Sequence, residues 1–405
     1  MSDPVPGERQ ARMVLNALPG MGPAMLRKLL PVFGDDPRAV LCATRAQLEE
    51  IPGLTVKAAE GVLRWRDLFD PAREEARLRA LGGDLLIEED PAYPALLREI
   101  HDPPIALYRL GHYDMDAPCV AIVGTRRATP YGIAQARALA TGLARAGFCV
   151  VSGMARGIDT VAHEAALDAG GPTVAVMGTG IDDIYPTSNR DLHSRIVARG
   201  AVLSEFPIGR QADRQTFAMR NRIVAGMCQV VVVVESDEAG GSMITATFAN
   251  DLGRTVCAIP GRADQSSSRG CHQLIREGAV LVCDVAQVID ELNYLKGMSP
   301  NPRERGRGRQ GEEEQDLSLN PRQGGRRGGA ASRPCVEIPR DMAPEQVAVL
   351  RCFRGGELLS ADSLVVRLGG AVAGHSAALL QLEMRGLVAR RRDGWYEASV
   401  DFGTL

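Results

Sequence analysis

The chain of 405 residues is longer than one ordinary domain, and two or three domains are expected at about 150 residues each. Hydrophobic residues make up 45% of the chain and charged residues 24%, a balance that excludes a fibrous or wholly disordered protein. The formal net charge of −3 excludes a polycation, so any nucleic-acid site has to be a local basic patch.

The sequence predicts a protein of the cytoplasm. No apolar run reaches the roughly 18 residues that span a bilayer, so no membrane association is expected. The first ten residues lack a basic segment followed by an apolar one, and no signal peptide is expected. The nine cysteines are odd in number and no pair is spaced C-x-x-C. Neither a disulfide framework nor a metal site is therefore predicted, and a reducing compartment fits best.

Changes in composition divide the chain into four predicted segments. Residues 1–75 are expected to form a helical domain, 80–296 an α/β domain, 297–340 a flexible linker and 341–402 a small α+β domain. The linker is rich in Gly, Pro, Arg and Glu and has almost no large apolar side chain to bury. An arginine-rich arm for nucleic acid is the alternative, but the acidic run Glu312–Glu314 favours a linker.

The predicted helical domain contains two similar turns. Leu18–Gly20 and Ile51–Gly53 both read apolar–Pro–Gly, and each precedes a helical pattern, at 24–30 and 56–65. This arrangement resembles the helix-hairpin-helix pair, in which amides at a helix N-terminus can hold a DNA backbone. The second turn lacks the second glycine of the first, so two hairpins that merely pack together are slightly favoured.

Apolar strand-like runs alternate with helical segments from about residue 118 to residue 295. These runs are Cys119–Val123, Phe148–Val151, Thr173–Met177, Ala201–Leu203, Gln229–Val234, Thr255–Ile259 and Ala279–Val282. Continuous apolar strands joined by helices, such as 132–146 and 158–169, indicate a parallel sheet covered on both faces. The predicted fold class is a Rossmann-like doubly wound α/β domain.

The last segment predicts a winged-helix domain. Its expected elements are helices at 342–353, 360–368 and 373–385 and strands at 387–390 and 395–397. In DNA-binding members of this class the third helix enters the major groove, but here it carries a single arginine. The hairpin holds Arg390–Arg392, so a DNA partner and a protein partner fit about equally well.

Glycine, serine or threonine follows nearly every predicted strand. In a doubly wound sheet, ligands bind at the carboxyl ends of the strands, where glycine lets a phosphate approach the backbone closely. We therefore expect backbone amides to converge on an anion, although some of these glycines only permit tight turns. The candidate positions are Gly124, Thr125, Arg126, Ser152, Gly153, Arg156, Gly178, Thr179, Gly180, Gly241 and Ser242.

The two common nucleotide-binding fingerprints are absent. No G-x-G-x-x-G follows the first predicted strand, and no G-x-x-x-x-G-K-[ST] occurs, which excludes a P-loop ATPase. A free nucleotide or a nucleic-acid backbone remains as the ligand, and no cofactor is predicted.

The segment Arg214–Arg222 helps to choose between them. It contains three arginines and Phe217 but no acid, which suits single-stranded nucleic acid because cations follow the phosphates and the ring stacks on a base. An equally weighted alternative is that Arg220 and Arg222 pair with carboxylates while Phe217 caps the core.

Five motifs in fixed order resemble those of the DNA-processing protein A (DprA, also called Smf) family, and the resemblance runs from about residue 90 to residue 279. The motifs are G-[ST]-R at Gly124–Arg126, S-G-x-A-x-G-I-D-x-x-A-H at Ser152–His163, G-T-G-I-D-x-x-Y-P at Gly178–Pro186, S-E-F-P at Ser204–Pro207 and F-x-x-R-N-R at Phe217–Arg222. Two departures are Gly240–Ser242, where the family usually reads S-G-S, and Gly270–His272, where it usually reads G-[TS]-N.

The resemblance implies a protein that binds and protects single-stranded DNA and loads the RecA recombinase onto it in natural transformation and recombination. It further implies a homodimer formed through the Rossmann domain and no enzymatic activity. Carried over by position, Arg126 and Arg214 contact phosphate and Phe217 stacks on a base. Arg220, Asn221 and Arg222 belong to the same motif as Phe217.

Two other functions fit part of the sequence. Rossmann relatives that hydrolyse nucleoside monophosphates carry P-G-G-x-G-T-x-x-E, and Gly240–Ser242 shares its glycines, but no acid follows until Asp251. The candidate acid–base groups are His163, Asp159, Glu205 and Glu235, although a structural role is favoured for the first two. The other alternative is a transcription factor that reads duplex DNA through the winged helix.

Overall fold

The computed structural model describes residues 6–113 and 117–298 and a set of short stretches between 335 and 402. The chain divides into two compact units, residues 1–308 and 309–405. Most of the predicted linker, and most of the second and third helices predicted for the last domain, lie outside the described residues.

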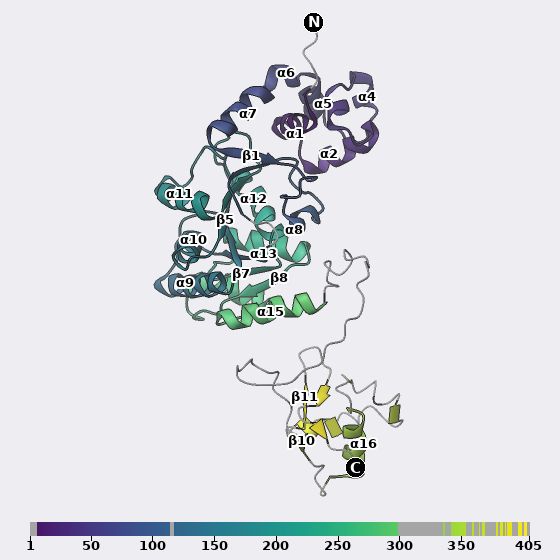
Figure 1. Ribbon diagram of the computed structural model, residues 1–405, viewed down its shortest axis with the longest axis vertical. Coiled ribbons are helices and arrows are strands. Elements are labelled where there is room, and N and C mark those ends of the chain that lie inside the picture. The colour runs from purple at the N-terminus through teal and green to yellow at the C-terminus, as the bar shows by residue number, and fades with distance from the viewer. Residues whose placement is uncertain are drawn as a thin grey trace, which may run out of the picture. The chain divides into compact units, whose positions relative to one another are not determined.

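The N-terminal part of the first unit is helical, as predicted. Its elements are α1 (Glu8–Ala17), α2 (Pro23–Leu29), η1 (Leu30–Phe33), α3 (Pro37–Leu41), α4 (Arg45–Glu49), α5 (Val56–Leu63), α6 (Trp65–Leu68) and α7 (Pro71–Ala80). Gly20 and Gly53 have φ angles of 79° and 77°, which explains glycine at both similar turns. Leu15, Leu29 and Leu48 belong to one shared core, so the two hairpins pack together (Figure 1).

A nine-stranded sheet forms the centre of the first unit. Its strands are β1 (Gly83–Leu86), β2 (Leu107–Gly111), β3 (Cys119–Val123), β4 (Cys149–Ser152), β5 (Thr173–Met177), β6 (Ala201–Ser204), β7 (Val230–Val233), β8 (Thr255–Ala258) and β9 (Val280–Leu281). Their order is β1-β2-β6-β5-β4-β3-β7-β8-β9, and the seven strands from β6 to β9 are parallel. These seven are the predicted apolar runs, and the doubly wound fold class is confirmed.

Strands β1 and β2 were not predicted, and they add an antiparallel edge next to β6. Each contains a charged residue that interrupts its apolar pattern, Asp84 in β1 and Arg109 in β2. The two residues are cross-strand partners, and Arg109 Nε donates to Asp84 Oδ1 over 2.8 Å. The charges therefore satisfy each other at the sheet edge, a compensation that the linear sequence does not reveal.

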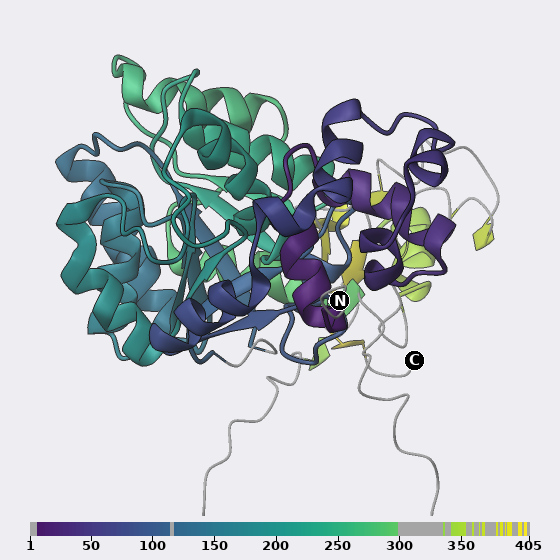
Figure 2. The ribbon, with the colours of Figure 1, turned by 90° about the horizontal axis from the view of Figure 1, so that it is seen from above.

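Helices cover both faces of the sheet (Figures 1 and 2). Alternate residues of each strand point to opposite faces, so that Val174 and Val176 of β5 face one core while Ala175 and Met177 face another. One face carries α9 (Pro130–Arg145), α10 (Ile158–Asp168), η2 (Thr187–Asn189), α11 (Arg190–Arg199) and α15 (Val285–Met298). The other carries α8 (Ala95–Arg98), α12 (Arg214–Gly226), α13 (Gly241–Asp251), η3 (Ser266–Ser268) and α14 (Arg269–Arg276).

The chain reverses its direction of travel across the sheet between β3 and β7. From β3 it steps through β4 and β5 to β6, and it then returns to place β7 on the opposite side of β3. The loop after β3 leads to α9 on one face, and the loop after β7 leads to α13 on the other. The loops therefore diverge and leave a crevice at the carboxyl ends of these two strands, which is where doubly wound folds bind ligands.

The described parts of the second unit contain α16 (Pro344–Arg351) and two small sheets. The strands are β10 (Cys335–Val336), β11 (Val388–Arg390), β12 (Tyr396–Ala398) and β13 (Asp401–Phe402). Strands β11 and β12 pair antiparallel and confirm the predicted hairpin. Leu350, Phe353 and Leu382 are buried in a small core of their own.

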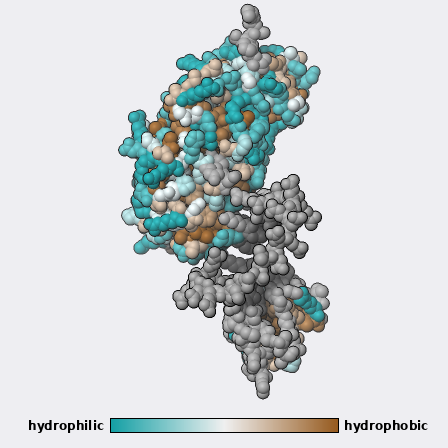
Figure 3. Space-filling model, viewed as in Figure 1, coloured by the Kyte–Doolittle hydropathy of each residue, from teal (hydrophilic) through white to brown (hydrophobic). Residues whose placement is uncertain are grey.

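The surface of the described residues mixes polar and apolar side chains. In Figure 3 the visible face of the first unit is mostly hydrophilic, with smaller hydrophobic areas between. Within the described ranges, none of the helices has both the length and the apolar character that crossing a membrane requires.

Candidate functional site

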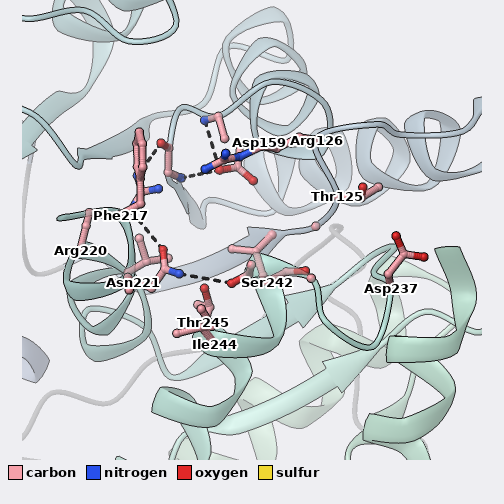
Figure 4. Close-up of a pocket in the computed structure, with 18 of the residues that line it drawn as sticks. Thr125, Arg126, Asp159, Phe217, Arg220, Asn221, Asp237, Ser242, Ile244 and Thr245 are labelled. Carbon is pink, nitrogen blue, oxygen red and sulfur yellow. Dashed lines mark hydrogen bonds between the residues drawn. The ribbon is translucent and has the colours of Figure 1, made fainter. Parts of the chain in front are cut away.

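A cavity of 640 Å³ opens at the crevice between β3 and β7. Its walls come from the loops after β3, β4 and β7, from Asp159 at the start of α10, from one side of α12 and from the start of α13 (Figure 4). The cavity brings together most of the predicted site residues. These are Gly124, Thr125, Arg126, Gly153, Arg214, Phe217, Arg220, Asn221, Gly241 and Ser242.

The Phe217 ring is held in place from several directions. The Asp213 side chain caps α12 by accepting a hydrogen bond from the Thr216 amide over 2.8 Å, which sets where the helix begins. A Cβ atom added to Gly178 would lie 2.7 Å from the ring, so only glycine allows the ring to sit there. The Arg126 guanidinium lies over the ring at 5.1 Å from its centroid. Since cations favour aromatic faces, Arg126 and Phe217 form one surface.

Arg220 forms part of the cavity floor and is itself buried. Its guanidinium donates to the carbonyls of Gly153 and Val176, and its Nε donates to Asn221 Oδ1 over 3.2 Å. Burial lowers the pKa of Arg220 to about 10, so the group stays charged at neutral pH. A Cβ atom on Gly153 would lie 2.5 Å from this guanidinium, which explains the glycine.

Asp159 fixes the loop after β4 from below. Its Oδ2 accepts hydrogen bonds from the amides of Gly153 and Ala155, over 3.1 and 3.3 Å. Burial raises the pKa of this carboxyl, while the neighbouring Arg220 charge opposes that rise. Buried hydrogen bonds to Asp159 therefore hold the loop after β4 in place. The exposed rim of the cavity is formed by other residues.

The exposed rim of the cavity is basic. Arg126, Arg127 and Arg214 are exposed, and none of the three forms an ion pair with any residue described in the structure. The acids that line the cavity are the buried Asp159 and the exposed Asp237. Guanidinium groups without a carboxylate partner remain available for an external anion.

A second, smaller cavity of 250 Å³ adjoins the first and shares Arg126, Gly153 and Phe217 with it. Arg156, a predicted site residue, lines this cavity rather than the larger one. Tyr185 also lines it, with its ring centroid 5.5 Å from that of Phe217.

Four predicted residues at the end of β4 or just after β5 line neither cavity. Ser152 Oγ donates to the Ile122 carbonyl over 2.6 Å, and Thr179 Oγ1 donates to the Asp183 carbonyl over 2.7 Å. The Gly180 amide donates to the Arg210 carbonyl over 2.7 Å. Gly178 packs under Phe217. These residues shape the loops that carry the cavity.

Arg222 is also placed away from both cavities. It is buried in an ion pair with Glu205, and its Nη1 donates to the Asp102 carbonyl over 2.8 Å. The carboxylate of Asp102 lies 3.3 Å from the Arg222 Nε. The pairing with carboxylates that the sequence left open is therefore found for Arg222.

Sequence reasoning missed several residues of this site. Arg127, Tyr185, Asp237, Ile244 and Thr245 line the cavities but were not among the predicted positions. Tyr185 could have been predicted, because it belongs to the motif at 178–186 after β5. Asp237 and Ile244 gave no such signal, since their positions depend on how the β7 loop meets α13.

Residues 84–293 match the family model described as DNA recombination-mediator protein A, and residues 337–394 match the DprA winged helix domain. Protein Smf from Synechocystis sp. is 34% identical over 386 residues, which cover 92% of this chain and 94% of that protein. The chain belongs to the DprA/Smf family. The predicted family is confirmed, and so is the C-terminal winged helix.

Other family members agree with this assignment. DNA processing protein DprA from Streptococcus pneumoniae is 43% identical over 206 residues, which cover 51% of this chain and 73% of the relative. The X-ray structure of that organism's DNA processing protein A matches with a TM-score of 0.61 and 34% identity, over 70% of this chain and 97% of that one. The family is one of DNA-processing proteins.

The candidate acid–base groups of this DprA/Smf protein are engaged inside the fold. Glu235 accepts hydrogen bonds from the Thr129 amide and the Ser267 hydroxyl, over 2.9 and 2.7 Å. Glu205 is buried against Arg222, and burial raises its pKa. The described residues also contain no group of His, Cys, Asp and Glu that could hold a metal ion.

His163 is fully buried and bonded through Nδ1 to Thr173 Oγ1 over 2.6 Å. Because the Thr173 hydroxyl donates to the Val150 carbonyl, Nδ1 of His163 has to be the donor. Nε2 is buried and has no hydrogen-bond partner among the described residues, and burial lowers the pKa of His163 to about 3. The imidazole is therefore neutral at physiological pH and packs between α10 and β5.

Proposed function

We propose that this DprA/Smf protein binds single-stranded DNA in the cavity at the switch point between β3 and β7. The observation that carries the proposal is the joint surface of Arg126 and Phe217, where a guanidinium with no ion pair to any described residue lies 5.1 Å from an aromatic centroid. Such a pair supplies both terms that single-strand binding needs, a cation for the phosphate and a ring for the base. Neither term depends on the base sequence.

In this proposal the other residues have distinct roles. Arg126 and Arg214 hold phosphates at the rim, and the amides at the start of α13 approach the backbone. Phe217 stacks on a base, which contributes roughly 1–3 kcal/mol. Arg220 and Arg222 are positioning residues, because their guanidinium groups are already bonded inside the fold.

We further propose, on family membership, that the bound strand is protected and passed to the RecA recombinase in recombination or natural transformation. The same reasoning gives a cytoplasmic homodimer formed through the Rossmann domain. The composition of the chain gives the proposed division into 1–75, 80–296, 297–340 and 341–402. A binding protein is favoured over a nucleotide hydrolase, because the candidate acid–base groups hold internal hydrogen bonds. Release of ribose 5-phosphate from a nucleoside monophosphate would contradict this choice.

The proposal is tested by the salt dependence of binding. If about four phosphates are engaged per protomer, a log–log plot of affinity against salt has a slope near −3. A slope near zero in a fluorescence anisotropy titration with a labelled oligonucleotide would rule out backbone binding. Duplex competitor of the same length should displace the strand poorly.

A further inference from the structure

The second cavity offers a further binding surface, and its argument rests on the proposed function. It is lined by Arg126, Arg127, Gly153, Ala155, Arg156, Tyr185, Pro186 and Phe217. This set contains three arginines and two aromatic rings but no acid. At 250 Å³ the cavity is smaller than a typical site for a separate ligand, and it continues directly into the larger one. Its size and composition fit an extension of one site.

Tyr185 is an exposed aromatic side chain held by a well-anchored loop. Its residue is 49% exposed, whereas Pro186 beside it is buried. Thr179 Oγ1 closes the loop on the Asp183 carbonyl, and Asp182 Oδ1 accepts from the Gly209 amide over 2.7 Å. A ring presented on a pre-ordered loop loses little conformational entropy when a ligand covers it.

The two rings form a continuous aromatic surface. The Tyr185 and Phe217 centroids are 5.5 Å apart with an interplanar angle of 46°, which is the geometry of rings in contact. A base therefore has no room between them, and Tyr185, which is exposed, offers a surface of its own. Arg156 and Arg127 stand exposed around the Tyr185 side and have no ion pair among the described residues.

We propose that Tyr185 is a second stacking platform, on which a base neighbouring the one on Phe217 packs while Arg156 holds the adjoining phosphate. The strand then runs from the larger cavity across the Arg126–Phe217 surface into the smaller one. Single-stranded nucleic acid is the ligand that fits, because successive bases need successive π-faces and successive phosphates need successive cations.

The test compares Tyr185→Ala with Tyr131→Ala. Tyr131 is a matched control, because it is 43% exposed, lies in the same α/β domain and lines neither cavity. Loss of stacking at Tyr185 should weaken binding of a labelled oligothymidine roughly 5- to 150-fold. The salt slope should stay unchanged, since no phosphate contact is lost. Arg156→Ala should instead make the log–log salt slope shallower by about 0.7, because one phosphate contact is lost.

A third variant reports the contact directly. Tyr185→Trp keeps an aromatic face, so it should bind about as tightly as the wild type. Its fluorescence, after subtraction of the wild-type signal from Trp65 and Trp395, should be quenched when the oligonucleotide binds. Retained affinity in this variant also shows that the loop folds without the tyrosine.

The outcomes separate the two proposals. If the wild type binds and Phe217→Ala fails, but Tyr185→Ala matches Tyr131→Ala and Tyr185→Trp is not quenched, the second platform is wrong while the proposed function stands. If the wild type does not bind single strands, the proposed function fails and the second platform fails with it.

Discussion

At the scale of single residues, four of the arginines predicted for the site divide into two kinds. Arg126 and Arg214 are exposed at the cavity rim, whereas Arg220 and Arg222 are buried and bonded inside the fold. The sequence shows all four as basic residues in or near recurring motifs. The distinction depends on tertiary partners such as Glu205 and the Asp102 carbonyl, which lie 17 and 120 positions from Arg222. No local pattern could have predicted it.

The buried pair of Arg222 and Glu205 gives a stability prediction. Arg222→Met leaves Glu205 as an uncompensated buried carboxylate, so the free energy of unfolding should fall by about 3–5 kcal/mol. Arg126→Met removes an exposed charge and its contact with the Phe217 ring, and it should change the free energy of unfolding by less than about 1 kcal/mol. Urea unfolding of both variants measures the difference. If Arg222→Met unfolds like the wild type yet loses DNA binding, Arg222 contacts DNA instead.

At the scale of elements, the strands that could be predicted are those with uninterrupted apolar runs. β3 and β5 coincide with their predicted bounds, because both are buried between two helical layers. β1 and β2 were not predicted, because the charged residues Asp84 and Arg109 interrupt their apolar pattern. α10 begins at the predicted Ile158, whereas α9 begins at Pro130, two residues before its predicted start. The glycine-rich turns after the strands could be predicted from the sequence. Which of these loops meet around one cavity depends on the strand order, which the sequence does not show.

The packing of α10 on β5 predicts a pH dependence of stability. The unfolded His163 has an ordinary pKa near 6.5, and the folded one has a pKa of about 3. Above pH 6.5 both states are neutral and the stability is complete. As the pH falls from 6.5 towards 3, only the unfolded chain binds the proton, so the free energy of unfolding falls by about 1.4 kcal/mol per pH unit.

This contribution amounts to about 2 kcal/mol between pH 7 and pH 5. Denaturant unfolding at both pH values should show the wild type losing that much more than His163→Gln, whose side chain does not titrate. Other buried groups titrate equally in both proteins and cancel in the comparison. Equal losses would mean that the imidazole is not held neutral by burial.

At the scale of the whole molecule, the site lies within one compact unit. Residues 1–308 contain the sheet, both helical layers and all residues of the two cavities. The second unit has a core of its own, built from residues such as Phe353 and Leu382. Single-strand binding in this account therefore belongs to the first unit, and duplex recognition through the winged helix is a separate hypothesis.

Deletion of residues 299–405 separates these hypotheses. The truncated protein should keep most of its single-strand affinity, within about three-fold of the wild type. The reason is that it retains all residues of both cavities. Anisotropy with matched single-stranded and duplex oligonucleotides measures both activities. Loss of single-strand binding on truncation, in a protein that still unfolds cooperatively, would place the main site in the second unit.

The most direct measurement is anisotropy of a labelled single-stranded oligonucleotide titrated with the wild type and the Arg126→Ala/Phe217→Ala variant. Arg195→Ala/Tyr131→Ala is the control, because it removes an exposed arginine and an exposed ring outside both cavities. We expect tight binding by the wild type and the control and a loss of at least ten-fold in the Arg126→Ala/Phe217→Ala variant. Equal binding by all three proteins would contradict a DNA site at the switch point.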